Sequence, residues 1–240
     1  MGTKLDAKGI RFNPEELEKK SAQELVKWAL EAFGDKVALA TSFGAEDVVL
    51  IDMMVKINPK TRIFTLDTGR LPQETYDVME KIRQKYKINL EAFSPDTSET
   101  EEMITKNGPN LFYNSVEMRK LCCNVRKVKP LNRALSHLSA WICGLRREQS
   151  VTRAEVKKVE IDSAHHAIYK INPLADWTEK EVWDYIKKNN IPYNALHDKN
   201  YPSIGCAPCT RAVKPGEDVR AGRWWWENPE TKECGLHCQK

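Results

Sequence analysis

Short apolar runs alternate with longer amphipathic stretches along most of this chain. The apolar runs are typical of buried strands and lie at residues 37–40, 62–66, 88–95, 140–145 and 168–174. The other stretches repeat apolar residues at helical spacing, over residues 13–33, from about 48, from about 72, and over 115–137 and 178–189. Strands that alternate with helices predict an α/β fold with a mostly parallel sheet. Ligands of such sheets bind at the carboxyl ends of the strands.

Helix-start signals sharpen two of these predictions. Asn13 before Pro14 is a favourable N-cap, and Glu16 would complete a capping box. Thr178 with Glu181 gives the same signal for the last predicted helix. Beyond residue 190 the regular pattern fades. We therefore expect a nucleotide-binding domain over residues 1–200, and a segment over 201–240 that folds over the sheet's active edge and ends in a mobile tail.

Composition and charge narrow the functional class. With 240 residues, 41% hydrophobic residues and a net charge of +4, the chain fits a globular protein with an anionic ligand better than a nucleic-acid-binding surface. The first 20 residues lack the apolar core of a signal peptide, and no apolar run is long enough to span a membrane. We therefore expect a cytoplasmic protein without membrane or nucleic-acid partners. In a reducing cytoplasm, seven cysteines favour metal ligation or thiol chemistry over structural disulfides.

Four of the cysteines form two close pairs, Cys122–Cys123 and Cys206–Cys209. The second pair has a common metal-ligand spacing. On a helix, the adjacent pair would diverge by about 100°, so both thiolates converge poorly on one tetrahedral ion. An iron–sulfur cluster relaxes this demand, because each sulfur can bind a different iron. The spacing therefore favours an iron–sulfur cluster over zinc. The alternative is that Cys122 or Cys123 binds no metal and fills the core as a small hydrophobic residue. For Cys143, inside an apolar run, core filling is the favoured interpretation.

Near the C-terminus, Cys234, His237 and Cys238 admit three interpretations: a metal site, a disulfide, or a reactive thiol with a histidine nearby. The disulfide is disfavoured in a reducing compartment. The residues alone leave the other two open.

Several motifs together closely resemble the assimilatory adenylyl-sulfate reductases, from about residue 20 to residue 237. They are "TSFGAEDVVLIDM", "LDTGRLPQETY", "LCCNVRK", "GLRREQSVTRAEV", "IGCAPCTRAV", "GEDVRAGRWWWE" and "TKECGLH". The resemblance implies an adenine-nucleotide fold of the modified pyrophosphatase-loop type. It also implies reduction of adenosine 5′-phosphosulfate to sulfite and AMP, with thioredoxin or glutaredoxin as the electron donor. One 4Fe–4S cluster would be held by Cys122, Cys123, Cys206 and Cys209. A homo-oligomer is compatible with the sequence.

The resemblance also implies the catalytic and substrate-binding residues. Cys234 would attack the substrate's sulfur and form a thiosulfonate that thioredoxin releases as sulfite, with His237 lowering the thiol pKa or binding the sulfonate. Cys238 lies beyond the matching motif; a passive terminal thiol is the favoured interpretation, and a resolving cysteine or redox sensor is the alternative. The expected substrate-binding residues are Ser42, Gly44, Gly69, Arg70, Lys127, Arg146, Arg147, Gln149, Ser150, Arg153, Arg220 and Arg223. For the arginine-rich loop 146–153, a solvated charged loop is the alternative.

Three rival functions remain. Phosphoadenylyl-sulfate reductases share the tail but usually lack the four cysteines, and an enzyme that uses both substrates is also open. A tRNA-thiolating enzyme would need an intact ATP loop and a larger basic surface. A zinc-stapled nucleic-acid-binding module is disfavoured by the even balance of 38 basic and 34 acidic residues.

Overall fold

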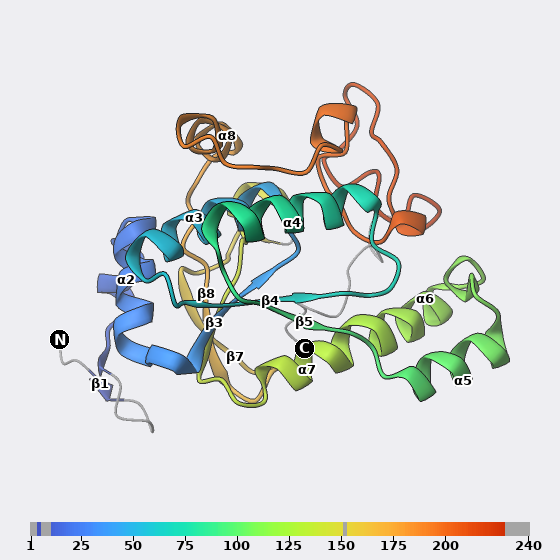
Figure 1. The fold of residues 1–240 in the computed structure, drawn as a ribbon, viewed down its shortest axis with the longest axis horizontal. Coiled ribbons are helices and arrows are strands. Elements are labelled where there is room, and N and C mark those ends of the chain that lie inside the picture. The colour runs from blue at the N-terminus through green and yellow to red at the C-terminus, as the bar shows by residue number, and fades with distance from the viewer. Residues whose placement is uncertain (1–3, 6–10, 151–152, 229–240) are drawn as a thin grey trace.

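A six-stranded sheet forms the centre of the computed structural model, which describes residues 4–5, 11–150 and 153–228 (Figure 1). The strands follow the order β5-β4-β3-β6-β8-β7, and all neighbours are parallel except β7, which runs antiparallel to β8 at one edge. The strands are β3 (Val37–Thr41), β4 (Arg62–Leu66), β5 (Leu90–Phe93), β6 (Ala140–Ile142), β7 (Val159–Asp162) and β8 (Ile168–Ile171). The α/β fold with a mostly parallel sheet is thus confirmed. A separate antiparallel pair joins β1 (Lys4–Leu5) to β2 (Arg11–Phe12).

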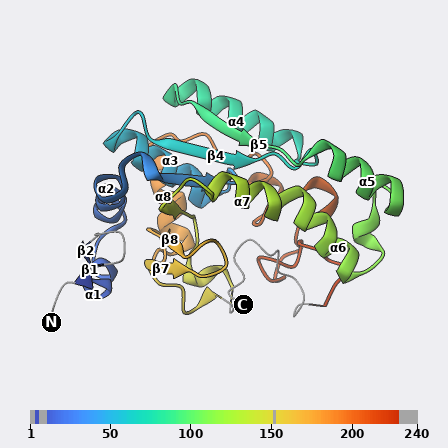
Figure 2. The same cartoon turned by 90° about the horizontal axis from the view of Figure 1, so that it is seen from below.

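Helices cover both faces of the sheet. They are α1 (Pro14–Glu18), α2 (Ala22–Phe33), α3 (Ala45–Ile57), α4 (Gln73–Tyr86), α5 (Thr97–Asn107), α6 (Val116–Cys123), α7 (Lys129–Leu135) and α8 (Glu179–Lys188). Figure 1 shows α3 and α4 above the sheet and α7 below it, and Figure 2 shows α6 and α7 along that lower side. Short 3₁₀ segments join them: η1 (Gly34–Lys36), η2 (Leu111–Tyr113), η4 (Arg147–Gln149), η6 (His197–Lys199) and η7 (Ala207–Cys209).

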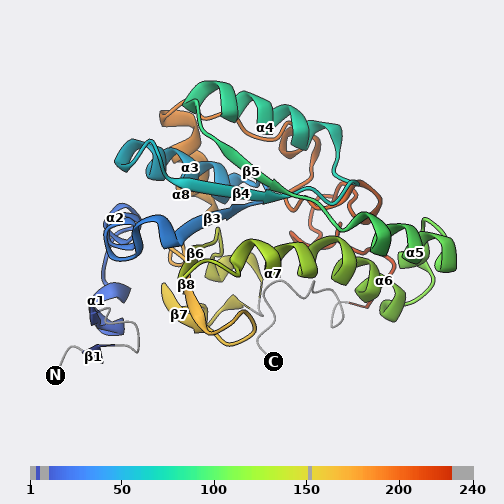
Figure 3. The ribbon, with the colours of Figure 1, turned by 60° about the horizontal axis from the view of Figure 1, so that its bottom comes forward.

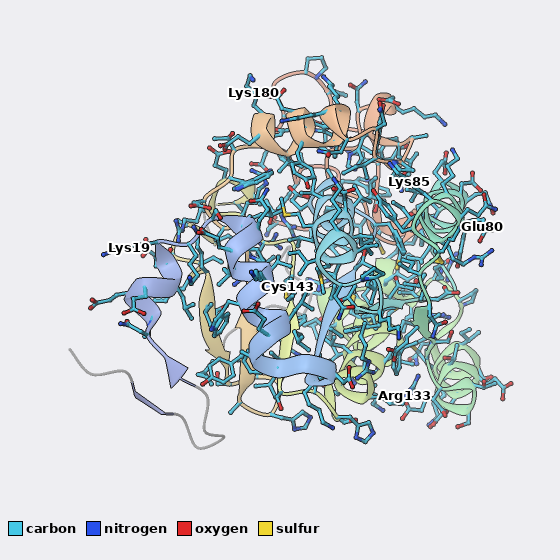
Figure 4. All side chains as sticks on the ribbon, turned by 60° about the vertical axis from the view of Figure 1, so that its left-hand side comes forward. Lys19, Glu80, Lys85, Arg133, Cys143 and Lys180 are labelled. Carbon is cyan, nitrogen blue, oxygen red and sulfur yellow. The ribbon has the colours of Figure 1, made fainter. Side chains whose placement is uncertain are left out.

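Each strand sends alternate side chains to opposite faces of the sheet, so the sheet separates two cores. Leu39 and Ile63 belong to the larger core, which includes residues of α2, α3, α4 and α8. Their neighbours Ala38 and Phe64 belong to a smaller core with α7. Cys143 is 3% exposed in the smaller core, as the sequence predicted, and Figure 4 shows it well inside the molecule.

The strand order reverses at the centre of the sheet. From β3 the chain proceeds outward to β4 and β5, and it then returns to the other side of β3 to form β6. The loops that follow β3 and β6 therefore leave the sheet in opposite directions. This divergence opens a crevice at their carboxyl ends, where open α/β sheets bind ligands.

The single helix predicted over residues 13–33 is wrong, because the chain breaks between α1 and α2. Asn13 does cap α1, but its side chain accepts from the Glu15 amide, and Glu16 forms no capping box. The capping box belongs to α2 instead, where Ser21 and Glu24 exchange side-chain and backbone hydrogen bonds. A capping box in which Ser21 and Glu24 each satisfy one helix-start amide outweighed continuous apolar spacing.

The antiparallel pair of β1 and β2 was not predicted, and neither were α5 and the edge strand β7. The last two carry little apolar signal: Met103 is the buried residue of α5, and Glu160 and Asp162 interrupt β7. The predicted helix at 115–137 is α6 and α7, joined by the π-helical segment η3 (Asn124–Val128), which Figure 3 shows continuing into α7. The strand at 62–66 and the Thr178–Glu181 capping box are confirmed. No helix among the described residues has the length and apolarity to cross a membrane.

Candidate active site

A cavity of about 310 Å³ opens at the carboxyl ends of β3, β4 and β6. Residues 202–205 and 219–223 close its far side. Its volume lies at the lower end of the range for small-molecule sites. Eight of the twelve predicted substrate-binding residues line it: Ser42, Gly44, Lys127, Arg146, Gln149, Arg153, Arg220 and Arg223.

The turn between β3 and α3 is held by Asp47. One oxygen of this buried carboxylate accepts hydrogen bonds from the Ser42 amide at 2.6 Å and the Ser42 hydroxyl at 2.8 Å. Burial raises the pKa of Asp47 to about 6, against the opposing effect of these bonds. Phe43 occupies the left-handed region at φ 58°, a conformation that glycine adopts more readily than a residue with a side chain. Its ring is 1% exposed in the larger core, and this burial holds the unusual conformation.

Gly144 packs against the same turn from the end of β6. A Cβ atom at Gly144 would lie 2.5 Å from Asp47 Oδ1 and 2.9 Å from Glu46 Cβ. The position is therefore closed to a side chain unless the turn moves. The Gly144 carbonyl accepts a hydrogen bond from Gln149, which ties loop 146–150 to the strand end.

The arginines of the loop after β6 have different partners. Arg146 donates to Glu46 at 2.8 Å and its side chain is 7% exposed, so a carboxylate already offsets its charge. Arg153 donates to the Gln149 side chain and lines the cavity. Arg147 pairs with Glu18 of α1 and donates to a backbone carbonyl. The alternative of a solvated loop is therefore wrong for Arg146, which is buried.

Four predicted substrate-binding residues, Gly69, Arg70, Arg147 and Ser150, do not line this cavity. Gly69 takes a left-handed conformation at φ 68°, and its amide donates to Asp67. Arg70 binds the Pro109 carbonyl and the Asn110 side chain.

Cationic side chains line the side of the cavity formed by residues 202–223. Arg223 is 7% exposed, donates to Ser203 Oγ at 3.2 Å, and stacks over the Trp224 ring at 4.9 Å. A Cβ atom on Gly205 would lie 2.3 Å from an Arg223 guanidinium nitrogen, so this glycine provides room for the arginine. With Lys127 and Arg220, these groups can bind an oxyanion.

All four paired cysteines line a second cavity and are each 8% exposed. Cys206 lies 3.3 Å from the Thr68 hydroxyl. Burial works against ionisation of Cys206, but Lys127 and Thr68 together hold the pKa of this thiol below its usual value. Burial raises the pKa of Cys209 to about 12. Over residues 4–5, 11–150 and 153–228, no three Cys, His, Asp or Glu side chains form a group that could hold a single metal ion.

The surroundings of the cysteine pocket suit an anionic group. Arg70, Arg119, Arg126 and Lys127 all line it. Within the described part of the chain, two buried donors there, Arg126 Nε and Trp224 Nε1, have no hydrogen-bond partner. Buried donors are rarely left unsatisfied unless an ion or water completes the site, so they fit a negatively charged cofactor between the thiols. Lys127 lines both cavities and therefore connects them.

Sequence reasoning missed two groups of residues near these cavities. Arg119 pairs with Glu227, and its position four residues before Cys123, one helical turn away, was a usable signal. His197 lines the first cavity with a buried Nε2 that lacks a hydrogen-bond partner among the described residues. Burial lowers its pKa, so the ring is neutral at physiological pH. The predicted tail residues Cys234, His237 and Cys238 lie outside the described residues.

A mostly parallel open sheet with a cation-lined cavity where its strand order reverses, beside a pocket of four thiols, defines an α/β protein built to bind an anionic ligand at the carboxyl ends of its strands. The chain belongs to the phosphoadenosine phosphosulfate reductase family, whose domain matches residues 36–212. It is 55% identical to the adenosine 5′-phosphosulfate reductase of Allochromatium vinosum, over 85% of this chain and 79% of the relative. The same-named protein of Burkholderia cepacia is 53% identical, over 85% and 81%.

Solved structures agree with this assignment of the fold. The phosphoadenylyl-sulfate reductase from Candida auris, in a phosphate complex, superposes with a TM-score of 0.73 at 30% identity, over 88% of this chain and 98% of that one. The FMN adenylyltransferase of Candida glabrata shares the fold alone, with a TM-score of 0.56 at 14% identity over 89% of this chain and 74% of that one.

Proposed function

We propose that this protein reduces adenosine 5′-phosphosulfate to sulfite and AMP in sulfate assimilation. The observation that carries the proposal is the pair of cavities joined by Lys127, one lined by cations at the sheet's switch point and the other by four thiols. The names of the Allochromatium and Burkholderia relatives support the substrate. The five cysteines among the described residues form no disulfide with one another.

In this proposal the first cavity holds the nucleotide. The strand ends and the turn at Ser42 and Gly44 would bind the adenosine part and its α-phosphate. Lys127, Arg220 and Arg223 would bind the phosphosulfate. Because the substrate is dianionic and its attacker is a thiolate, fixed cations are needed for the two to approach each other.

Cys122, Cys123, Cys206 and Cys209 would hold one 4Fe–4S cluster. Cys122 and Cys123 are consecutive in the last turn of α6, so their sulfurs diverge and suit separate irons better than one ion. When bound, the cluster would supply a fixed negative charge, which the cationic side chains lining its pocket would offset. Arg126 and Trp224 would then have an acceptor for their unpaired donors.

Cys234 would be the nucleophile. Its thiolate attacks the sulfur of the phosphosulfate, the sulfur–oxygen bond to the phosphate breaks, and AMP leaves with the bonding electrons. The enzyme then carries a thiosulfonate, Cys–S–SO₃⁻. A dithiol donor of the thioredoxin type attacks the Cys234 sulfur, releases sulfite, and its second thiol resolves the mixed disulfide. His237 would favour the thiolate or bind the sulfonate.

A mass-spectrometric experiment tests this scheme. Incubated with adenosine 5′-phosphosulfate and no reductant, the protein should gain the mass of one SO₃ group on Cys234. Reduced thioredoxin should then remove that mass and release sulfite. Cys234→Ser should abolish both steps, and Cys238→Ser should keep most activity. An adduct on Cys238, or sulfite production by Cys234→Ser, would refute the mechanism.

Phosphoadenylyl-sulfate reduction is the second candidate function, favoured by the superposition with the Candida auris structure. Comparing kcat/KM for the two substrates with the same donor separates the candidates. We expect the substrate without the 3′-phosphate to be preferred, and the reverse preference would exchange the two assignments.

A further inference from the structure

Arg119 and Glu227 form a buried ion pair beside the cysteine pocket. Arg119 donates through Nε to Glu227 Oε1 at 2.9 Å and through Nη2 to Oε2 at 2.8 Å. The two side chains are 1% and 3% exposed. Such a two-pronged contact fixes orientation as well as distance, because the planar guanidinium matches both carboxylate oxygens. The pair joins residues 108 positions apart in sequence.

The pair belongs to a continuous stack that reaches from the pocket of thiols to the substrate cavity. Arg119 lines the cysteine pocket together with Cys123, which follows it by four residues on α6. Its guanidinium lies 4.6 Å from the centre of the Trp224 ring, and Arg223 of the substrate cavity lies over the same ring at 4.9 Å. The Trp224 amide donates to the Cys209 carbonyl. Glu227 is therefore linked through Arg119 and Trp224 to residues of both cavities.

Glu227 also stands directly before the segment that carries the proposed nucleophile. Cys234 follows Glu227 by seven residues, so it can lie no further than about 25 Å from this fixed point, whatever the conformation between them. The Glu227 amide donates to the Trp224 carbonyl at 2.8 Å, which adds a short turn at the same place. We call residues 224–228 the tail root.

We propose that the Arg119–Glu227 ion pair is a positioning device that anchors the tail root against the helix carrying Cys122 and Cys123, so that Cys234 meets the phosphosulfate in a fixed orientation. The inference rests on the function proposed above. Arg119 and Glu227 are positioning residues, since neither lines the substrate cavity.

A simple tether and an orienting anchor predict different magnitudes. Without the ion pair, Trp224 would be the last residue of the tail root held in place. The separation in sequence between the anchored residue and Cys234 would then grow from seven residues to ten. Effective concentration falls roughly as the −3/2 power of length, so a longer tether alone costs less than about twofold in rate. Loss of orientation costs about ten- to a hundredfold.

Glu227→Gln is the test variant, because it keeps the shape and removes the charge. Glu217→Gln is the matched control: Glu217 pairs with Arg211 at 2.9 Å on the same segment, but both side chains are about one third exposed. Arg119→Lys, which keeps the charge and removes the two-pronged geometry, serves if Glu227→Gln folds poorly. For each variant we would measure iron content, substrate affinity, the single-turnover rate of thiosulfonate formation, and amide hydrogen exchange in the tail root.

We expect Glu227→Gln to retain iron and bind substrate within about threefold of wild type, while thiosulfonate formation slows at least tenfold and exchange at residues 224–228 accelerates. Arg119→Lys should give a smaller change in the same direction, and Glu217→Gln none. An unchanged single-turnover rate, unchanged hydrogen exchange, or iron loss in proportion to activity would each overturn the anchor. If wild-type protein forms no thiosulfonate, the proposed function fails, and hydrogen exchange still decides whether the pair holds the tail root.

Discussion

Gly144 offers the sharpest test of how the substrate cavity is built. In Gly144→Ala, the added methyl group would meet the Asp47 carboxylate at 2.5 Å and Glu46 Cβ at 2.9 Å. Neither neighbour can simply rotate away. The carboxylate of Asp47 holds the Ser42 amide and hydroxyl through its other oxygen, and Cβ of Glu46 is fixed to the first turn of α3.

The cost of this change follows from the contact distances. Overpacking a closed site typically costs about 1–3 kcal/mol, and for a chain of this size each kcal/mol lowers Tm by about 2–4 °C. We therefore expect Gly144→Ala to lose roughly 2–12 °C in Tm. The displaced turn should also weaken AMP binding, because Ser42 and Gly44 line the cavity.

Gly44→Ala is the control for this experiment. Gly44 has an ordinary φ of −68°, and a Cβ atom there meets nothing nearer than 3.6 Å. The stability of Gly44→Ala should stay within about 1 kcal/mol of wild type. Alanine lowers the conformational entropy of the unfolded chain, and this gain offsets the loss from a poorer N-cap. A methyl group facing the cavity should still weaken AMP binding. Thermal unfolding and titration calorimetry with AMP measure both effects, and a Gly144→Ala protein with unchanged Tm and unchanged AMP affinity would refute the steric argument.

Three further substitutions, with Arg147→Ala as a control, test the electrostatics of the site. Asp47 has a folded pKa of about 6 against 3.8 ordinarily, so the stability linked to its protonation is complete below about pH 4 and is lost as pH rises through 6. Asp47→Asn should remove that pH dependence and raise stability at pH 8 relative to wild type by up to about 3 kcal/mol, measured by denaturation at both pH values. Arg153→Ala should weaken substrate binding by about 1.5–3 kcal/mol, because Arg153 lines the cavity. Arg147 does not line the cavity, so Arg147→Ala should leave substrate binding unchanged. Equal losses of affinity in a binding titration of the two variants would contradict this assignment. Lys127→Ala should weaken substrate binding and also change the visible spectrum of the iron-loaded protein, and a change in only one of them would show that this residue does not connect the two cavities.

Local patterns predicted the centre of the fold because each strand and helix carries its own signal. The strand at 62–66 is buried on both faces and is bounded by polar turns, so its apolar run matches the observed β4. The capping box at Thr178 is a contact between neighbours in sequence. By contrast, β7 is stabilised by pairing with β8 and by the Glu160–Lys170 ion pair, which its own residues do not reveal.

The site could be predicted by residue type but not by partner. Arg146, Arg147 and Arg153 look alike in sequence, yet they contact Glu46, Glu18 and Gln149. Those partners come from α3, from α1 and from the same loop, so only the tertiary fold distinguishes a cavity arginine from a structural one. The Arg119–Glu227 pair could not be predicted from sequence for the same reason, because its two residues meet only in the tertiary fold. The four-residue spacing of Arg119 to Cys123 indicated only that Arg119 lies near the cysteines.

The four paired cysteines lie apart from the two hydrophobic cores of the sheet. Leu39, Ile63 and their neighbours form the two cores on the faces of the sheet, and no paired cysteine belongs to either. The four cysteines lie instead in a third hydrophobic cluster with Phe112 and Trp224. That cluster meets the sheet through a few polar contacts: Thr68 binds Cys206 through its hydroxyl and Arg126 through its carbonyl. The lining of a pocket attached in this way can change while the sheet keeps its packing, and Lys127, which lines both cavities, brings its charge to each of them.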